Sequence, residues 1–314
     1  MVLKALLSRR GGPHARLVVI GDYAVFARAA RQLRRRLPAW RLARPSDAWH
    51  RSPAPLTFID CGHSGAFIPG RPSRAAGKAA LAYIEHAVAL WRAKRIHGLV
   101  TAPVTKWAIE QSSPHFVGQT EHLARAMGRR DVVMMFVSHR LRIVLLTRHL
   151  ALRDVARSLD RRLVRVTLRL TADALRQQFG IRRPRLAVCG LNPHAGESGL
   201  LGREERWVLR PVMRAAQRAG LVCDGPFAAD GFFADAGDYD AVVCCYHDQG
   251  LIPFKMAARD RGCQMTIGLP LVRTSPDHGS ALDIAGRGVA DPGSMRYALD
   301  LAIALTERHV ARDL

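Results

Sequence analysis

The sequence has no run of about 18 uncharged apolar residues, the length that a transmembrane helix requires. Its start, "MVLKALLSRRGG", is apolar over too short a stretch and basic too soon to be a secretory signal. It also has no internal repeat, low-complexity tract or flexible linker, while 48% of its 314 residues are hydrophobic. We therefore expect a globular cytoplasmic protein with an ample core and no membrane partner.

Cysteine is infrequent, and its pattern excludes two classes of protein. The six cysteines show no CxxC spacing, which argues against a zinc ribbon, and no framework typical of disulfide-rich secreted domains. Four of them lie in or beside apolar, strand-like runs. We interpret all six as reduced core residues, namely Cys61, Cys189, Cys223, Cys244, Cys245 and Cys263.

Lysine is scarce, although the chain is strongly basic: 48 Lys and Arg stand against 26 Asp and Glu, a formal net charge of +22. The arginines are scattered along helix faces, as in "RQLRRR" and "RRLVRVTLR", and are not gathered into one arm with interleaved aromatics. This distribution favours a solvated basic surface that attracts anionic substrates. We therefore expect a small anionic substrate and no nucleic-acid partner.

Strand-like and helix-like segments alternate along the chain. Eight runs are apolar, rich in β-branched residues and bounded by turn formers, namely 16–22, 56–61, 98–103, 132–138, 141–147, 185–193, 241–247 and 264–270. Segments with apolar residues three and four apart lie between them, namely 73–94, 152–179, 204–218 and 294–309. The alternation predicts an α/β fold with a largely parallel sheet. Any second domain is expected to be inserted into the first.

Polar residues cluster where the predicted strands end, which is where open α/β sheets bind ligands. In "CCYHDQGLIPFK" an apolar run ends at His247, and His149 and His194 likewise follow strand-like runs. Three imidazoles suit zinc and leave coordination positions open for a substrate. The alternative is that each histidine is a hydrogen-bonded structural residue, because sequence spacings alone do not establish proximity.

A glycine-rich stretch, "RTSPDHGSALDIAGRGVADP" (273–292), joins a turn to a short helix and a second glycine turn. Small residues let a backbone approach a ligand closely and leave amide groups free for phosphate. A dinucleotide is the obvious candidate ligand, although the sequence has no GxGxxG fingerprint. The alternative is an ordinary surface loop.

The motifs "TAPVTK", "NPHAGESGLLGREE", "YHDQGLIPFK" and "GLPLVRTSPDHGSALDIAGRG" resemble the 4-hydroxythreonine-4-phosphate dehydrogenase (PdxA) family in order and spacing. The resemblance runs from about residue 3 to the C-terminus. It implies the two-domain α/β fold of the isocitrate and isopropylmalate dehydrogenases, with mixed, largely parallel sheets and an active-site cleft between the domains. We expect a cofactor-side domain of residues 1–118 and 265–314. The inserted domain, 119–264, would hold the metal and the dimer interface.

The resemblance also implies an activity. Members of the family use NAD or NADP to oxidise the secondary alcohol of 4-(phosphooxy)-L-threonine in pyridoxine biosynthesis, and the keto acid then loses carbon dioxide. The implied assembly is a cytoplasmic homodimer with metal sites at its interface. Each subunit would hold one divalent ion, zinc first and cobalt, manganese or magnesium as substitutes.

The family's functional residues fall on definite positions of this sequence. The implied metal ligands are the three histidines already noted, His149, His194 and His247. The implied substrate contacts are Gln119, Thr120, Lys255, Gln264 and Arg273. The implied cofactor-binding residues are His278, Gly279, Ser280, Asp283 and Gly286. Lys106 and Asp248 are candidate catalytic residues, with the general base unassigned.

Three departures from the family keep other functions open. Gln119 stands where the family has histidine, and Gln264 stands where it has asparagine. Met1 falls inside the helix that follows the family's opening strand and "GDPAGIGPE"-type turn, so the first strand is expected to be missing. One alternative is a paralogue acting on a phosphorylated sugar acid of the 4-phospho-threonate or erythronate type, or on a cis-dihydrodiol dicarboxylate. The other is a truncated, non-catalytic dimer.

Overall fold

The computed structural model describes residues 1–8, 15–38, 40–47, 56–62 and 67–313. Its contacts divide the chain into two compact units, which we call unit 1 (residues 1–128 and 273–312) and unit 2 (129–272). Across these ranges, no helix combines the length and the apolar character needed to cross a membrane. The boundaries lie within ten residues of those expected for the two domains, and the roles expected of the domains stay predictions.

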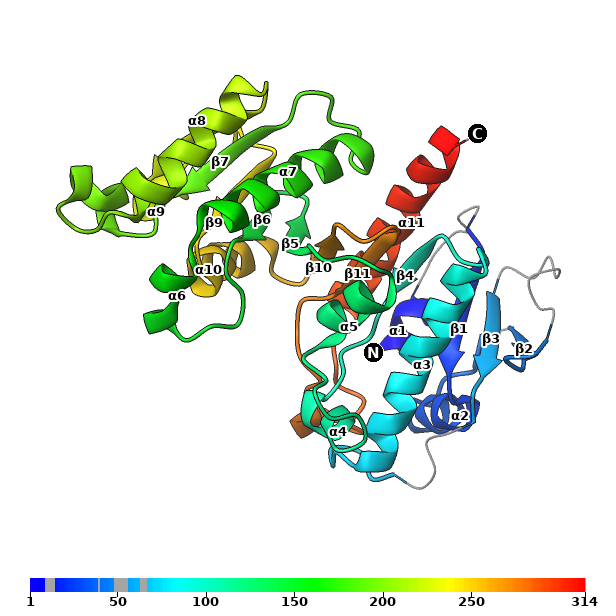
Figure 1. The fold of residues 1–314 in the computed structure, drawn as a ribbon. Coiled ribbons are helices and arrows are strands. Elements are labelled where there is room, and N and C mark those ends of the chain that lie inside the picture. Colours follow the sequence, from blue (N-terminus) through cyan, green and yellow to red (C-terminus); the bar gives the residue numbers. More distant parts are fainter. Residues whose placement is uncertain (9–14, 39, 48–55, 63–66, 314) are drawn as a thin grey trace. The chain divides into compact units, whose positions relative to one another are not determined.

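Unit 1 contains a three-stranded parallel sheet in the order β1-β3-β2 and the neighbouring strands β4 and β11, which belong to a second sheet (Figure 1). Its strands are β1 (Leu17–Gly21), β2 (Arg41–Ala43), β3 (Leu56–Asp60), β4 (Gly98–Val100) and β11 (Val272–Pro276). Its helices are α1 (Val2–Leu7), α2 (Tyr23–Gln32), α3 (Arg74–Arg92), α4 (Lys106–Glu110), α5 (Gln119–Ala126), η4 (Leu282–Ile284) and α11 (Gly293–Asp313).

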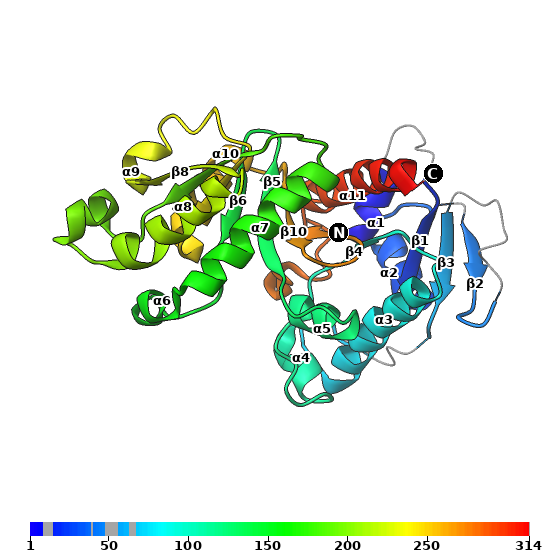
Figure 2. The same ribbon diagram turned by 45° about the horizontal axis from the view of Figure 1, so that its top comes forward.

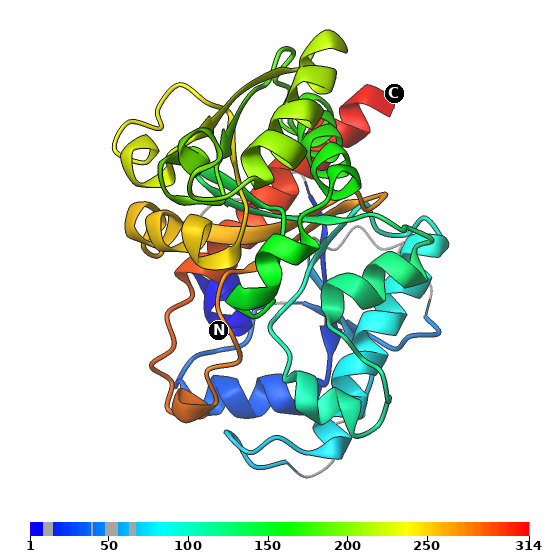
Figure 3. The same ribbon diagram turned by 60° about the vertical axis from the view of Figure 1, so that its left-hand side comes forward.

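Local sequence signals explain where the unit 1 helices begin. Asp22 precedes α2, and its carboxylate accepts hydrogen bonds from the amides of Ala24 and Val25. Ser73 caps α3 in the same way, so each cap satisfies amide groups that a helix start leaves without a partner. Helix α3 lies against α4 (Figures 1 and 3), where the missing side chain of Gly77 lets the Ala108 backbone approach.

Unit 2 is built on a mixed sheet in the order β10-β5-β6-β9-β7-β8. Figure 2 labels four of these strands, β10, β5, β6 and β8. The pairs β10–β5 and β5–β6 are antiparallel, whereas β6, β9, β7 and β8 run parallel. The strands are β5 (Val133–Ser138), β6 (Arg142–Leu145), β7 (Arg185–Cys189), β8 (Val222–Phe227), β9 (Ala241–Cys244) and β10 (Gly262–Ile267). The helices are α6 (Leu152–Ser158), α7 (Arg161–Gln177), η2 (Pro193–Gly199), η3 (Glu205–Leu209), α8 (Arg210–Arg218), α9 (Ala229–Phe232) and α10 (His247–Ala258).

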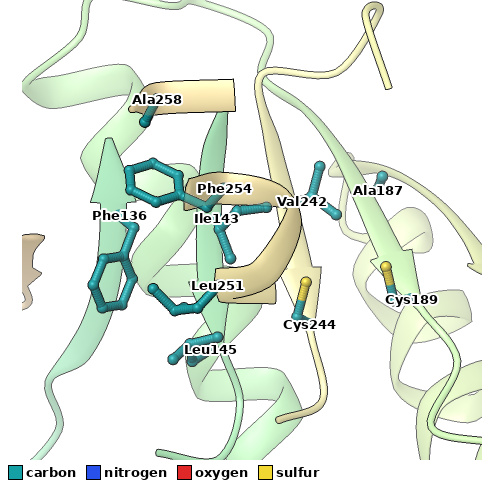
Figure 4. Packing of buried hydrophobic residues seen from close by; sticks show 10 residues of the cluster. All are labelled: Phe136, Ile143, Leu145, Ala187, Cys189, Val242, Cys244, Leu251, Phe254 and Ala258. Atoms are coloured by element: carbon teal, nitrogen blue, oxygen red, sulfur yellow. The ribbon is translucent and has the colours of Figure 1, made fainter. Parts of the chain in front are cut away.

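The core of unit 2 forms where α10 covers the sheet (Figure 4). Phe254 of α10 is fully buried and meets Phe136 of β5 edge-on, with ring centroids 5.7 Å apart. Two cysteines, Cys189 and Cys244, belong to the same cluster. All six cysteines are buried free thiols, which agrees with their interpretation as core residues. Burial raises the pKa of the Cys223 thiol to about 11, so this thiol stays neutral.

The structure corrects several predicted elements. The segment 152–179 is two helices, because Asp160 interrupts it and caps α7 by accepting a hydrogen bond from the Leu163 amide. The run 241–247 ends as a strand at Cys244, and His247 already begins α10. Strands β2, β8 and β11 were not predicted, because β2 is only three residues long and the other two contain Pro226 or Arg273.

Candidate active site

The three predicted metal-ligand histidines all follow the carboxyl ends of adjacent parallel strands in unit 2. His149 comes after β6, His247 after β9 and His194 after β7, and β9 pairs with both of the others. The order of the strands in the sheet differs from their order in the chain. Three segments that are distant in sequence therefore lie at the same end of neighbouring strands. This is the edge at which open α/β sheets bind their ligands.

Two of the three rings lie beside each other. The ring centroids of His149 and His247 are 5.7 Å apart, and Nδ1 of His247 lies 2.7 Å from Oδ1 of Asp248. His194 is exposed, with Nδ1 3.5 Å from Oε2 of Glu197. Among the described residues, no three His, Cys, Asp or Glu side chains of this one chain are close enough together to hold a metal ion.

Sequence reasoning missed Gln249, which joins two of these strand ends. Its Nε2 donates a 2.7 Å hydrogen bond to the Gly190 carbonyl after β7, and its Oε1 accepts one of 2.7 Å from the Cys245 amide after β9. The Cys245 carbonyl in turn accepts from the amide and the hydroxyl of Thr147, two residues before His149. The sequence offered one signal for this residue: a glutamine placed just after an apolar run can hydrogen-bond to the backbone at the end of a strand. Hydrogen bonds to the backbone therefore connect the ends of the three strands that precede the histidines.

The segment that carries His194 is a left-handed turn. Residues 194–198 all have positive φ, and four of the five are not glycine: His194, Ala195, Glu197 and Ser198. A non-glycine residue costs roughly 1 kcal/mol or more in this conformation, so the turn must be held by its surroundings. Conformational strain of this kind gathers at functional sites.

The buried carboxylate of Glu205 holds this turn. It accepts hydrogen bonds from the amide of Asn192 at 2.8 Å and from its Nδ2 at 3.0 Å, and only 3% of Glu205 is exposed. A Cβ on Gly196 would come within 2.6 Å of the Glu205 carboxylate, so this position has no room for a side chain. The predicted motif residues Asn192 and Glu205 are thus supports of the turn.

The predicted substrate contacts in unit 1 surround a buried guanidinium. Arg273 of β11 is 2% exposed, and its Nη2 donates to the Thr101 hydroxyl at 2.7 Å and to Oε1 of Gln119 at 2.9 Å. Its Nη1 lies 3.4 Å from the Thr120 hydroxyl. Gln119 also donates from Nε2 to the Ala102 carbonyl, so both ends of its amide are engaged.

The other two predicted contacts are in unit 2. Gln264 of β10 is buried, and its Nε2 donates to the Thr266 hydroxyl at 3.0 Å. Lys255 lies in the last turn of α10 and is exposed. The candidate catalytic residues are exposed as well, with Lys106 at the start of α4 and Asp248 in the first turn of α10.

The predicted cofactor loop borders a cavity of 380 Å³ within unit 1. Leu282, Ala285 and Gly286 line it together with Thr105, whose hydroxyl lies 3.2 Å from that of Ser280. His278, Gly279 and Asp283 are exposed, and Nδ1 of His278 lies 2.9 Å from the Gly279 carbonyl oxygen. A Cβ added to Gly279 would meet nothing within 4 Å, so its backbone is open to a ligand.

Comparisons with known proteins identify the family. Residues 13–302 match the model of "Pyridoxal phosphate biosynthetic protein PdxA". The 4-hydroxythreonine-4-phosphate dehydrogenase of Bradyrhizobium diazoefficiens is 41% identical over 299 residues, covering 90% of this chain and 86% of the relative. The D-threonate 4-phosphate dehydrogenase of Cupriavidus necator is 39% identical over 312 residues, covering 98% and 93%.

The fold comparison agrees. The crystal structure of 4-hydroxythreonine-4-phosphate dehydrogenase from Klebsiella pneumoniae superposes with a TM-score of 0.81 at 33% identity, covering 92% of this chain and 88% of that one. The predicted fold class is therefore confirmed, as is the resemblance based on the sequence motifs. The chain belongs to the PdxA family and is an oxidoreductase of the kind that acts on CH–OH groups.

Proposed function

We propose that the chain uses NAD or NADP and a divalent metal to oxidise the secondary alcohol of 4-(phosphooxy)-L-threonine, with decarboxylation of the resulting keto acid. The convergence of His149, His194 and His247 at one edge of the unit 2 sheet carries this proposal. Family membership supports the dehydrogenase chemistry, and a dehydrogenase of this kind implies a nicotinamide cofactor in general.

The donor set of the three histidines fits a divalent ion such as zinc. Neutral imidazoles are favoured zinc ligands, and two of the rings are already adjacent. With Nδ1 of His247 directed at Asp248, the other ring nitrogen, Nε2, remains for the ion. We therefore infer that Asp248 orients the ring of His247. Of the two candidate catalytic residues, Lys106 then remains as the candidate general base. An ion bound there would supply Lewis-acid polarisation of the substrate hydroxyl.

The buried Arg273 would bind an anionic group of the substrate. A guanidinium held in place by hydroxyl and amide oxygens is suited to two-point recognition of a carboxylate or a phosphate. Thr120, also in unit 1, would add a contact to the same group, and Lys255 in unit 2 stays a predicted substrate contact. A nicotinamide cofactor, when bound, would accept the hydride from the alcohol carbon, and Lys106 would take the proton of the hydroxyl. The bond from the α-carbon to the carboxylate would then break with release of carbon dioxide, its electron pair would pass into an enolate of the new ketone, and the enolate would take up a proton.

We propose that the site is completed by homodimerisation. Within one chain the described histidines do not close around a metal, so a partner subunit would supply the missing ligand. Large apolar side chains are exposed on the elements that carry the histidines: Ile252 and Met256 on one face of α10, Leu150 and Leu152 near His149, and Leu200 after η2. Such exposed apolar groups are typical of a surface that a partner covers.

A phosphorylated sugar acid is the second candidate substrate. The relative from Cupriavidus necator carries the name D-threonate 4-phosphate dehydrogenase and aligns over nearly the whole chain. Gln119 contacts Arg273 where the family has histidine, so the charge next to this guanidinium differs from that in the family. The change alters the group beside the guanidinium that would bind an anionic part of the substrate, and it therefore supports a substrate other than 4-(phosphooxy)-L-threonine.

Turnover assays separate these functions. The zinc-loaded protein would be mixed with NAD or NADP and, in parallel, with 4-(phosphooxy)-L-threonine, D-threonate 4-phosphate, D-erythronate 4-phosphate and a cis-dihydrodiol dicarboxylate. Formation of reduced nicotinamide and release of carbon dioxide would be followed together. The first substrate should give the highest kcat/KM. A preference for either sugar acid would establish the paralogue, and no turnover of any of the four would favour the non-catalytic dimer.

A further inference from the structure

A row of arginines runs along η3 and α8 on unit 2. The arginines recur every four residues, namely at Arg206, Arg210, Arg214 and Arg218. All four side chains are exposed, whereas Val212 and Met213 of α8 are buried. Residues four apart are neighbours on a helix surface, so the four guanidinium groups lie on the same outward side of the helix.

Helix α7 adds two arginines beside this row. Helices α7 and α8 cover the face of the unit 2 sheet opposite α10 (Figure 1), and α7 packs against both η3 and α8. Nε of Arg161 donates a 2.9 Å hydrogen bond to the Trp207 carbonyl, and Arg165 is exposed one turn further along α7. We call the six residues the arginine surface: Arg161, Arg165, Arg206, Arg210, Arg214 and Arg218. The fold thus gathers arginines from two segments that are separate in the sequence.

The charge of the arginine surface is little compensated. Helix α8 contains no acidic residue, and among the described residues none of the four arginines of the row forms an ion pair. On α7, by contrast, Arg162 pairs with Asp131 at 2.6 Å. Arg169 likewise lies 3.5 Å from Asp173. Like charges four residues apart destabilise a helix, so an uncompensated row is suited to an anionic partner.

An exposed aromatic ring lies within the arginine surface. Trp207 is 54% exposed, and the guanidinium of Arg206 lies 5.5 Å from the centroid of its ring. Nucleic-acid bases stack on exposed aromatic rings of this kind, and a neighbouring arginine strengthens the stack. A helix rises by about 1.5 Å per residue, so the row advances by about 6 Å per arginine. That regular step suits a linear chain of phosphates.

We propose that the arginine surface binds single-stranded nucleic acid, with phosphates on the guanidinium groups and a base stacked on Trp207. A guanidinium matches two phosphate oxygens with parallel hydrogen bonds, which an ammonium cannot do. The exposed ring favours a nucleic acid over an acidic peptide, which would contact the charges alone. The expectation of no nucleic-acid partner was based on scattered arginines, and the packing of α7 against α8 removes that reason.

The test is fluorescence anisotropy with labelled oligouridylate and oligothymidylate of about 12 nucleotides, measured on the full chain over a range of salt concentrations. The first variant combines four changes: Arg206→Gln, Arg210→Gln, Arg214→Gln and Arg218→Gln. The control removes the same charge from exposed arginines of unit 1: Arg31→Gln, Arg34→Gln, Arg35→Gln and Arg36→Gln. The first variant should bind at least about tenfold more weakly, with a salt slope smaller by about 0.7 per lost contact. The control should stay within about twofold of the wild type.

A third variant, Trp207→Leu, keeps every arginine and should bind at least about fivefold more weakly, because it removes the stacking ring. Thermal unfolding verifies that the variants are folded, and the first should be at least as stable as the wild type, because repulsion along α8 is relieved. Tighter binding of one oligomer identifies RNA or DNA as the partner.

Three results would overturn the proposal. The first is no binding by the wild type, and the second is an equal loss in the first variant and the control, which would assign the attraction to net charge. The third is equally tight binding of polyglutamate or of phosphatidylserine vesicles, which would assign the surface to an acidic protein or a lipid. The readout does not involve turnover, so it is independent of the proposed reaction.

Discussion

Replacing Gln249 by alanine should weaken metal binding without touching a metal ligand. The wild-type side chain makes two hydrogen bonds of 2.7 Å, to Gly190 and from Cys245, which connect the ends of β7 and β9. Each contributes about 0.5 to 1.5 kcal/mol, so the pair contributes about 2 kcal/mol. If most of that loss appears as looser placement of His194 against His247, zinc should bind about 10- to 30-fold more weakly. Losses of this size are typical for groups that orient metal ligands.

The assay is competition for zinc with a chromophoric chelator, alongside urea unfolding. Gln217→Ala is the matched control, because it also removes a glutamine that donates a 2.7 Å hydrogen bond to a backbone carbonyl, that of Cys223. This control should lose about 1 kcal/mol of stability and retain wild-type zinc affinity. If Gln249→Ala loses stability while its zinc affinity stays within twofold of wild type, the positioning role is refuted. Absence of zinc binding in the wild type would instead refute the histidine site.

Three further predictions concern the metal, the cofactor and the substrate. Alanine at His194 or His247 should strip the divalent ion, about one per subunit, and loosen the dimer; full occupancy by elemental analysis would contradict the ligand assignment. Gly279→Val should weaken NAD binding in a calorimetric titration, because the added side chain would occupy the space that the ligand needs. The protein should stay folded, because that side chain meets no other atom in the free chain. Unchanged affinity would show that the loop is an ordinary surface loop. If the enzyme is a repurposed paralogue, Gln119→His with Gln264→Asn should raise kcat/KM for 4-(phosphooxy)-L-threonine at least tenfold, about 1.4 kcal/mol. Efficient turnover by a wild type that the double variant does not improve would exclude the paralogue.

Local sequence predicted the parts of this protein that depend on neighbouring residues. Alternating apolar runs and amphipathic segments indicated an α/β fold, because strand and helix periodicities are properties of a few consecutive residues. Histidines at the ends of apolar runs were placed after strands for the same reason, and their role as metal ligands stays a prediction. The boundary between α6 and α7 at Asp160 could also have been predicted, because an aspartate directly before an amphipathic run is a common N-cap.

Only the tertiary structure decided which segments meet. The order β6-β9-β7 brings His149, His247 and His194 to one edge, and strand order depends on long-range pairing that local patterns do not encode. The same holds for Arg273, whose burial in a strand is tolerable only because Thr101, Gln119 and Thr120 accept its hydrogen bonds. Strand β11 was not predicted, because an arginine in a sequence indicates an exposed position unless its distant hydrogen-bond partners are known. Sequence thus determined the elements and the residue types at their ends, and folding decided their neighbours, because burial and pairing are energies shared between segments far apart in the chain.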